Sequence, residues 1–263
     1  MSFPKMGLRV KRTHILLALL ALSVCAFPFR ERLIRPAVTF VRISKNAYNV
    51  KQRLAQYSPV VRERLAEDFR RADCPYPPAG LLLVGLKDEK QLEIWVKPET
   101  GKGYVLLKVY PIQGLCGGPG PKLVEGDGQV PEGIYRIDWL NPNSLYHLSM
   151  HIDYPNEYDK ARAVEDGREN LGGEIMIHGG SASAGCLAMG DEVAEDLFVL
   201  VAETGLANVE VILCPFDFRV RDLPEGVRQG TPHWTEELYG KIKQQLLNIS
   251  TGDIENKTPS PNA

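Results

Sequence analysis

The chain has 263 residues, of which 44% are hydrophobic and 24% charged, and its formal net charge is −2 at pH 7. This length suits one sizeable domain or two small ones. The near-neutral charge excludes the strongly basic class of nucleic-acid-binding proteins, and no basic stripe stands out beyond the N-terminus. We therefore expect no nucleic-acid partner.

The N-terminus has the pattern of an export segment. Basic residues from Lys5 to Arg12 precede an apolar run from Ile15 to Phe27, which is shorter than the ~20 residues of a free-standing membrane span. Small residues up to Ala26 offer a cleavage site, whereas Pro28 and the charges after it suit a short uncleaved anchor. Residues 1–29 are therefore interpreted as a signal peptide or a short membrane anchor, and the bulk of the chain as exported.

An amphipathic helix is predicted between that segment and the body of the chain. Val61, Leu65 and Phe69 recur every four residues within Val60–Asp73, as they do on the buried face of a helix. The proline-rich stretch from Cys74 onwards ends this pattern. We interpret residues 30–78 as a spacer that carries this packing helix.

The body of the chain is predicted to be mostly β. Apolar residues in alternating or continuous runs predict strands at 81–87, 91–97, 104–112, 133–139, 146–154, 174–178 and 208–214. Asp191–Thr204, with an acidic first turn and Gly205 after it, predicts a helix. Residues 232–247 predict a terminal helix, and residues 251–263 a disordered tail. The expected fold class is α+β, mostly β with a few helices.

Four cysteines remain once Cys25 in the export segment is set aside. An exported protein can form disulfides, but the sequence does not choose among the pairings. If Cys186 is a working thiol, at most one pair forms among Cys74, Cys116 and Cys214. The alternative is that Cys116 and Cys214 are small buried hydrophobic residues.

His147 and His151 have the spacing of two zinc ligands on a helix, but they lie in an alternating strand pattern. On a strand they would be ~13 Å apart, too far to share a metal directly. Each could instead combine with His178 and Cys186 in a zinc site. We favour the simpler interpretation, a polar strand face lining a groove, and we expect no metal and no cofactor.

The stretch IHGGSASAGCLAMGD, residues 177–191, places His178 and Cys186 on either side of a loop made only of Gly, Ser and Ala. Small residues there indicate either a tight turn that needs glycine backbone angles, or a loop that lets a substrate backbone approach Cys186. A free thiol has a pKa of about 8.5, so His178 would have to stabilise the thiolate at neutral pH.

Together with four other segments, this stretch resembles a known family. The motifs are Gly117–Lys122, Gly126–Tyr135, Asn141–Ser144, Asp153–Asn156 and the pair Ile177-His178-Gly179 and Ser183–Cys186. In this order they resemble the L,D-transpeptidase catalytic (YkuD-like) domain, and more narrowly the murein L,D-transpeptidase branch of Gram-negative envelope proteins. The resemblance runs from about Leu81 to about Arg219, and we assign residues 79–220 to this domain and 221–263 to the C-terminal helix and tail.

The resemblance implies a β-sandwich-type domain with one helix after the catalytic cysteine, acting on peptidoglycan stem peptides in the periplasm. Its N-terminal segment would leave it soluble or anchored to the inner membrane. Cys186 would attack the diaminopimelate carbonyl, and an amine would resolve the resulting thioester. His178 would be the base, oriented by a backbone carbonyl of the loop at 179–181. The resemblance further implies loop and oxyanion roles for Gly179, Ser183 and Gly185, and a groove with candidate residues Glu132, Gly133, His147, Tyr154 and Asn156.

Two departures from the family pattern keep other functions open. Ala184 stands where the family motif has a second histidine, and Ala188 where it usually has arginine. The loop between His178 and Cys186 is also shorter than in most members. A short loop leaves the thioester open to water, so the alternatives are a cysteine hydrolase that cuts the same linkages, a non-catalytic peptidoglycan-binding module, and a structural envelope protein with a zinc clip.

Overall fold

The structure is a computed structural model that describes residues 47–99, 103–222, 225 and 230–257, with side chains up to residue 249. The expected export segment, residues 1–29, lies outside the described residues, as does the end of the tail, 258–263. Within the described ranges, no helix combines the length and the apolar character that crossing a membrane requires. The division of the chain at residues 29, 78 and 220 stays a prediction.

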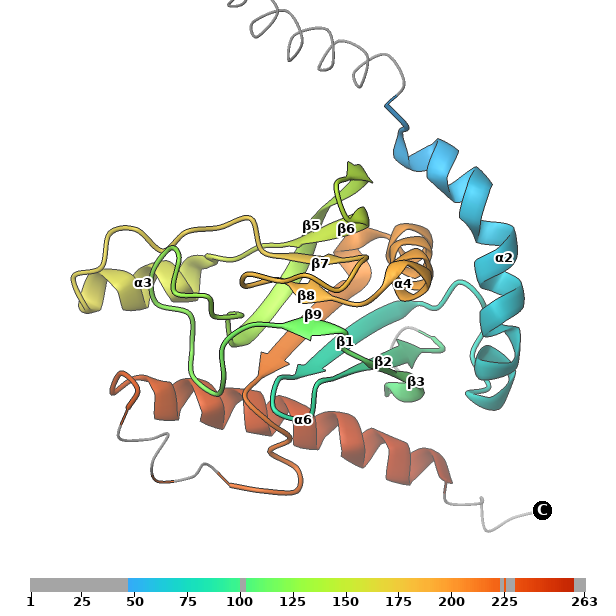
Figure 1. Cartoon of the computed structure of the whole chain (residues 1–263). Coiled ribbons are helices and arrows are strands. Elements are labelled where there is room, and N and C mark those ends of the chain that lie inside the picture. The colour runs from blue at the N-terminus through green and yellow to red at the C-terminus, as the bar shows by residue number, and fades with distance from the viewer. Residues whose placement is uncertain (1–46, 100–102, 223–224, 226–229, 258–263) are drawn as a thin grey trace, which may run out of the picture. The chain divides into compact units, whose positions relative to one another are not determined.

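The described strands form one nine-stranded sheet in the order β3-β2-β1-β9-β5-β6-β7-β8-β4 (Figure 1). Their bounds are Gly80–Leu86 (β1), Gln91–Lys97 (β2), Val105–Pro111 (β3), Gly114–Leu115 (β4), Gly133–Ser144 (β5), His147–Ile152 (β6), Met176–His178 (β7), Leu187–Ala188 (β8) and Val209–Cys214 (β9). The long strand β5 belongs to both halves of the sheet, because Gly133–Arg136 pairs with β9 and the rest pairs with β6. This architecture confirms the predicted mostly β, α+β fold class.

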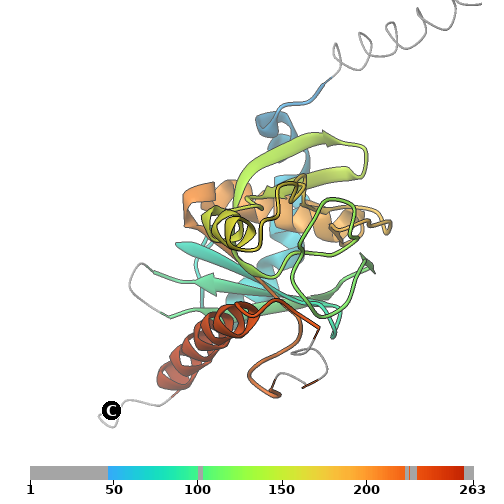
Figure 2. The same ribbon diagram turned by 90° about the vertical axis from the view of Figure 1, so that its left-hand side faces the viewer.

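Helices cover both sides of the first half of the sheet. β1 is buried along its whole length, because its side chains alternate between two hydrophobic cores. Leu81 and Leu83 pack in the core of α2 (Val50–Arg71) and α4 (Asp191–Thr204). Leu82 and Val84 pack in a second core with α6 (Thr235–Lys257). Figures 1 and 2 show α6 on one side of these strands and α2 and α4 on the other. A continuous apolar run is what a strand covered on both faces requires.

The structure corrects two predictions at the helix ends. α2 begins at Val50 rather than Val60, because Asn49 and Gln52 form a capping box and Pro59 is accommodated inside the helix. α6 continues to Lys257, so residues 251–257 are helical and not disordered. The buried spacing of Ile242, Leu246 and Ile249 carries the helical pattern past the predicted end at Leu247, and a helix once formed propagates easily.

A short helix escapes the sequence prediction. α3 spans Glu157–Glu165, and its start is fixed by a capping box in which the Asn156 side chain accepts from Asp159 N and the Asp159 side chain accepts from Asn156 N. Ala163 is the buried residue that it offers to the core. Because its apolar face is so small, the helix has no periodic hydrophobic pattern. Only the capping box indicates from the sequence where it begins.

A buried ion pair joins the sheet, the segment 114–132 and helix α6. The Lys87 ammonium donates to Glu132 Oε1 at 2.8 Å and to the carbonyls of Gly120 at 3.0 Å and Val130 at 2.9 Å. Glu132 Oε2 accepts from the Tyr239 hydroxyl of α6 at 2.5 Å. Both charged side chains are almost completely buried, and burial lowers the pKa of Lys87 although Glu132 acts against this. A buried charge needs such complete pairing to be tolerated.

We expect Lys87→Met to destabilise the protein strongly, because it leaves the Glu132 carboxylate buried without its cation. Losing one partner of a buried pair costs about 3–5 kcal/mol in the free energy of unfolding. Urea-induced unfolding followed by circular dichroism measures this cost. The double variant Lys87→Met/Glu132→Gln should recover part of the loss, because glutamine is neutral and can still accept from Tyr239.

The control for this prediction is Lys241→Met, which breaks an exposed pair with Glu237 on α6. Exposed pairs contribute little, so its unfolding midpoint should stay close to that of the wild type. If Lys87→Met unfolds at the same urea concentration as this control, the buried pair does not hold the segment 114–132.

Candidate active site

His178 is the last residue of β7, and it is held there in a defined tautomer. It pairs in register with Ser149 of β6 and is 2% exposed. Its Nδ1 lies 2.6 Å from the backbone oxygen of Gly179. A carbonyl oxygen can only accept, so Nδ1 carries the proton and Nε2 of the neutral ring has a free lone pair. This is the tautomer that a general base needs, and the Gly179 carbonyl takes the orienting place expected from the resemblance.

Tyr146 supports the imidazole from the side. Its ring stacks on His178 with a centroid distance of 4.6 Å and an interplanar angle of 29°. Tyr146 lies in the turn between β5 and β6 and remains 48% exposed. The sequence analysis did not select it as a site residue. Its contact with His178 arises from the pairing of β6 with β7, which the local sequence does not reveal.

Cys186 directly precedes β8, the strand next to the one that ends in His178. β7 and β8 are parallel, with Ile177 opposite Leu187 and His178 opposite Ala188. Cys186 directly precedes β8, and its sulfur lies at the backbone of the segment that leads into β7, beside Glu174 O. The structure thus places the two predicted catalytic residues on neighbouring segments, with His178 at the end of β7 and Cys186 just before β8. In the described part of the chain, the Cys186 thiol donates to Glu174 O at 3.7 Å and makes no hydrogen bond to His178.

The resting state of Cys186 is a protonated thiol. Burial raises the pKa of Cys186, and the neighbouring Cys116 and Glu174 act in the same direction. The Met176 N–H and the Lys122 ammonium act against this and do not outweigh burial. A thiol with a raised pKa is a poor nucleophile at neutral pH. The proton must therefore leave at the moment of reaction, which requires a base on the same face.

Ser183 shapes the turn that presents Cys186. Its hydroxyl donates to Cys186 O at 2.6 Å and accepts from Gly185 N at 3.3 Å. Gly185 has φ +122°, a conformation that other residues rarely adopt. A Cβ there would also lie 3.3 Å from Gln129 O. The predicted oxyanion donor Gly185 N–H is therefore held by Ser183 in this structure.

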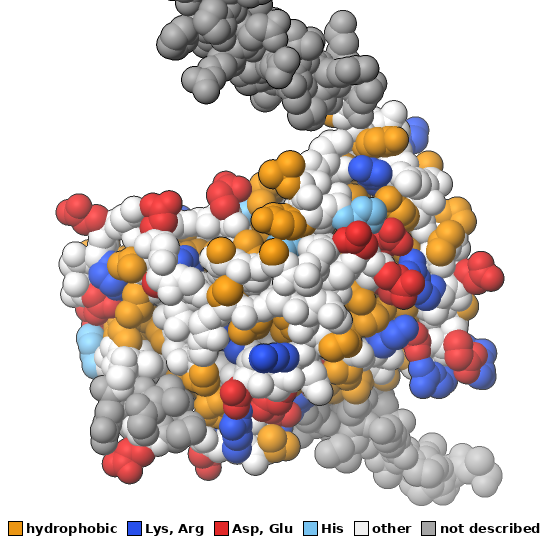
Figure 3. Space-filling model, in the orientation of Figure 1, with side chains coloured by type: hydrophobic (Ala, Val, Ile, Leu, Met, Phe, Trp, Pro, Cys, Tyr) orange, Lys and Arg blue, Asp and Glu red, His pale blue; other side chains and the backbone are white. Residues whose placement is uncertain are grey.

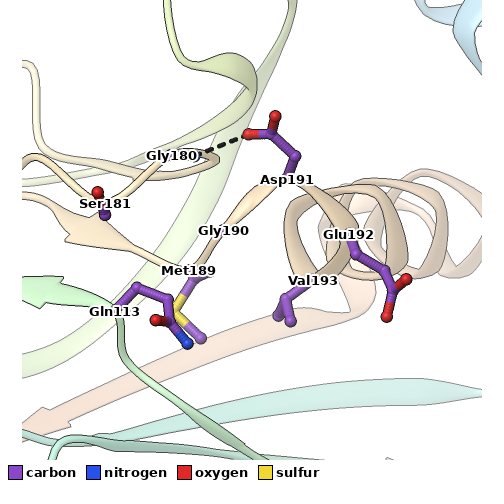
Figure 4. A pocket seen from close by; sticks show the side chains of 8 residues that line it. All are labelled: Gln113, Gly180, Ser181, Met189, Gly190, Asp191, Glu192 and Val193. Carbon is purple, nitrogen blue, oxygen red and sulfur yellow. Dashed lines mark hydrogen bonds between the residues drawn. The ribbon is translucent and has the colours of Figure 1, made fainter.

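The glycine after His178 is required by close packing. A Cβ on Gly179 would lie 2.6 Å from Asp191 Oδ1 and 2.7 Å from Tyr146 O. Asp191, the first residue of α4, accepts from Gly180 N at 2.8 Å, as the dashed line in Figure 4 shows. Helix α4 thus fixes the loop that follows His178.

A pocket of about 490 Å³ opens between this loop and the start of α4 (Figure 4). It is lined by Gln113, Gly180, Ser181, Met189, Gly190, Asp191, Glu192 and Val193. The pocket therefore borders the loop beyond His178 without including either His178 or Cys186. On the face of the molecule drawn in Figure 3, acidic and basic side chains are interspersed rather than gathered by sign.

The two other histidines of β6 have separate carboxylate partners. His147 Nε2 lies 2.9 Å from Glu195 Oε1, and His151 Nδ1 lies 2.6 Å from Asp138 Oδ1. Both are partly exposed while the residues between them are buried, so the predicted strand pattern is confirmed. Among the described residues, no group of three or more His, Cys, Asp or Glu is placed to hold a metal ion.

The remaining groove candidates make contacts inside the protein. Glu132 belongs to the buried pair with Lys87. Tyr154 is 3% exposed, and its hydroxyl donates to the carbonyls of Lys122 and Leu171 at 3.4 and 3.3 Å. Asn156 caps α3, and a Cβ on Gly133 would meet the ring of Tyr135. Their side chains hold the surrounding segments in place.

All four described cysteines are free thiols. Cys214 is completely buried and Cys74 is buried, as small hydrophobic residues are. Cys116 differs, because it is only partly buried and its thiol donates to Ser183 O at 2.8 Å. It therefore lies against the turn that carries Cys186.

Residues 86–213 match the family model described as "L,D-transpeptidase catalytic domain", YkuD. This part of the chain belongs to the L,D-transpeptidase family. The chain is 37% identical over 135 residues to "Putative L,D-transpeptidase YafK" of Escherichia coli (strain K12), and equally to its counterpart in strain O157:H7. The match covers 49% of this chain and 52% of each relative, so the chain spans about half the length of the curated relatives it matches.

Two solved structures are also similar to the chain. The helical cell shape determining protein Pgp2 from Campylobacter jejuni is 23% identical, with coverage of 52% and 48% of the two chains and a TM-score of 0.40. L,D-transpeptidase 1 from Mycobacterium tuberculosis is 12% identical, with coverage of 51% and 61% and a TM-score of 0.30.

We expect Cys186 in the free protein to react with iodoacetamide along a pH profile whose midpoint lies above that of an ordinary thiol, about 8.5. Burial raises the pKa of Cys186, so the reactive thiolate forms only at higher pH. The measurement follows alkylation of the Cys186 peptide by mass spectrometry, with a small free thiol as reference. A midpoint below that of the reference would instead show a resting ion pair with His178.

Proposed function

We propose that the chain is a cysteine-dependent L,D-transpeptidase that acts on peptidoglycan stem peptides. The family of residues 86–213 supports the reaction class. The observation that carries the proposal for this chain is that Cys186 directly precedes β8, the neighbour of β7, and that β7 ends in His178 held in the tautomer of a base. A binding module that performs no chemistry has no need of this arrangement.

The reaction begins when the substrate displaces the Cys186 thiol from its hydrogen bond to Glu174 O. Nε2 of His178 takes the thiol proton, and the sulfur attacks the carbonyl of the diaminopimelate residue. The carbonyl of Gly179 stabilises the imidazolium that forms, because it accepts from Nδ1. His178 then returns the proton to the leaving amine of D-alanine, and a thioester remains on Cys186.

An acceptor amine completes the transfer. His178 removes a proton from the attacking amine, the amine bonds to the thioester carbonyl, and the Cys186 thiolate leaves. Tyr146, stacked on the imidazole, keeps the ring in one orientation through both steps. The proposed substrate class and the export segment expected at residues 1–29 both support a periplasmic location, and fractionation of cells tests it.

We expect Cys186→Ala to abolish turnover of purified muropeptides and leave the fold intact, because it removes one small, partly exposed side chain. His178→Ala should lower the rate roughly 10²–10⁴-fold, the usual contribution of a proton-transfer group. Product formation read by mass spectrometry checks both variants. Retained turnover in Cys186→Ala would remove the thiol mechanism.

His151→Ala is the matched control for the base. His151 lies on the neighbouring strand, where it pairs with Asp138 and stacks on Trp139 with a centroid distance of 5.3 Å. Its loss should leave the rate near that of the wild type. If His178→Ala lowers the rate only a few-fold and His151→Ala lowers it more, the base is His151 and not His178.

Hydrolysis of the same linkage is the second candidate activity, and the exposure of the loop favours it. Ser181, Ala182 and Ala184 are exposed, and none of them has a bulky side chain. Transfer requires the thioester to survive until an amine arrives, so a site must exclude water or hold the amine. The loop over residues 179–185 offers little cover of its own.

We therefore expect both released and exchanged products when a donor muropeptide is supplied with a large excess of a D-amino acid. The exposed loop lets water compete with the amine for the thioester. Separation of the products by chromatography and mass spectrometry gives the ratio. Complete conversion to the exchanged peptide would contradict the open-site argument and leave transfer as the sole activity.

A further inference from the structure

A second thiol lies beside the proposed nucleophile and has no role in the mechanism above. Cys116 follows β4 directly, and β4 is the antiparallel neighbour of β8, which follows Cys186 directly. The two cysteines are free and partly buried. By contrast, Cys74 and Cys214 are buried in hydrophobic cores.

Cys116 and Cys186 lie just outside β4 and β8, and the register of these strands, extended by one residue, sets the two cysteines opposite each other. Gly114 lies opposite Ala188 and Leu115 opposite Leu187, so the next pair in this register is Cys116 and Cys186. Opposite residues of antiparallel strands have Cα atoms about 4.5–5.5 Å apart and side chains on one face. A disulfide needs Cα atoms about 4.4–6.8 Å apart. The geometry therefore meets the main condition for a bridge.

The turn around Ser183 holds the two thiols near each other. The Cys116 thiol donates to Ser183 O at 2.8 Å, and the Ser183 hydroxyl donates to Cys186 O at 2.6 Å. Gly114 permits this approach, because a Cβ there would lie 2.0 Å from Ser181 O. The segment around Cys116 thus packs directly on the loop between His178 and Cys186.

We propose that Cys116 is a resolving thiol, and that Cys116 and Cys186 form a reversible disulfide by exchange with small-molecule disulfides. The bridge covers the Cys186 sulfur and prevents its attack on a carbonyl. That last consequence rests on the proposed function, in which Cys186 is the nucleophile. Formation of the bridge does not.

The exchange proceeds in two balanced steps. The Cys186 thiolate attacks one sulfur of the small disulfide, whose sulfur–sulfur bond breaks and releases one thiolate. The Cys116 thiolate then attacks Cys186 Sγ of this mixed disulfide and releases the second small thiolate. The protein loses two electrons and two protons, and the small disulfide gains them as two thiols. A small thiol reductant reverses both steps.

The test is incubation of the full chain with oxidised glutathione, followed by intact mass and peptide mapping. We expect the wild type to lose two hydrogen atoms, with the peptides of Cys116 and Cys186 joined. In Cys116→Ser, whose hydroxyl can still donate to Ser183 O, Cys186 should keep the glutathione. Its release should be slower than in the wild type by roughly tenfold or more, because the internal thiol acts at a high effective concentration.

Cys74→Ser is the matched control, because it removes a buried cysteine whose pKa burial raises to about 11. It should form the same bridge as the wild type. A glutathione adduct that persists on Cys186 of the wild type, or a bridge that involves Cys74 or Cys214, would overturn the proposal, and mapping of the wild type alone detects both.

This readout separates the proposal from the proposed function. A bridge without muropeptide turnover in the reduced protein would leave the resolving thiol standing and reject the transpeptidase. Turnover that depends on Cys186, with no bridge under oxidised glutathione, would support the transpeptidase and reject the resolving thiol.

Discussion

The buried contact between Lys87 and Glu132 is the constraint that ties the candidate site to the rest of the fold. Three parts of the chain meet there, since Lys87 follows β1, Glu132 precedes β5, and Tyr239 of α6 donates to Glu132. The same ammonium holds the carbonyl of Val130. Next to Val130, the carbonyl oxygen of Gln129 lies 3.3 Å from the position that a Cβ on Gly185 would take. The ion pair therefore positions the backbone against which the turn at Gly185 and Cys186 packs. Helix α6, which lies outside the residues that match the family model, contributes Tyr239 to this contact.

The small residues around His178 and Cys186 fall into two groups, those that packing requires and those that it does not. Gly179 and Gly185 are required by backbone and packing, because a side chain would strike Asp191 in one case and approach Gln129 in the other. Ser181, Ala182 and Ala184 meet no such limit and are exposed. Packing explains the glycines, and access for a bulky substrate agrees with the small exposed side chains between them.

Local patterns in the sequence predicted most of the longer elements but not which of them lie side by side. The apolar run at Leu81 and the helix at Asp191–Thr204 follow from burial on both faces and from periodicity, and both are present. The parallel pairing of β7 with β8 depends on contacts between strands of two and three residues, too short to carry a pattern. The sequence analysis also missed Tyr146, which reaches the imidazole of His178 only through the pairing of β6 with β7. The sequence analysis also missed the buried role of Lys87, because a lysine at the end of an apolar strand is usually solvated.

The resting geometry of Cys186 bears on both proposals for this thiol, as a nucleophile and as a partner of Cys116 in a disulfide. Burial raises the pKa of Cys186, and its hydrogen bond to Glu174 O keeps the proton on sulfur. Thiol–disulfide exchange depends on the thiolate, so the first attack on an external disulfide is slow. Once a mixed disulfide forms, however, the second step is intramolecular and is favoured by proximity, because Cys116 is held by Ser183 at the same turn. The turn that carries Cys186 therefore keeps this thiol protonated before the substrate arrives. The same turn holds Cys116 where it can displace a small thiol bound to Cys186.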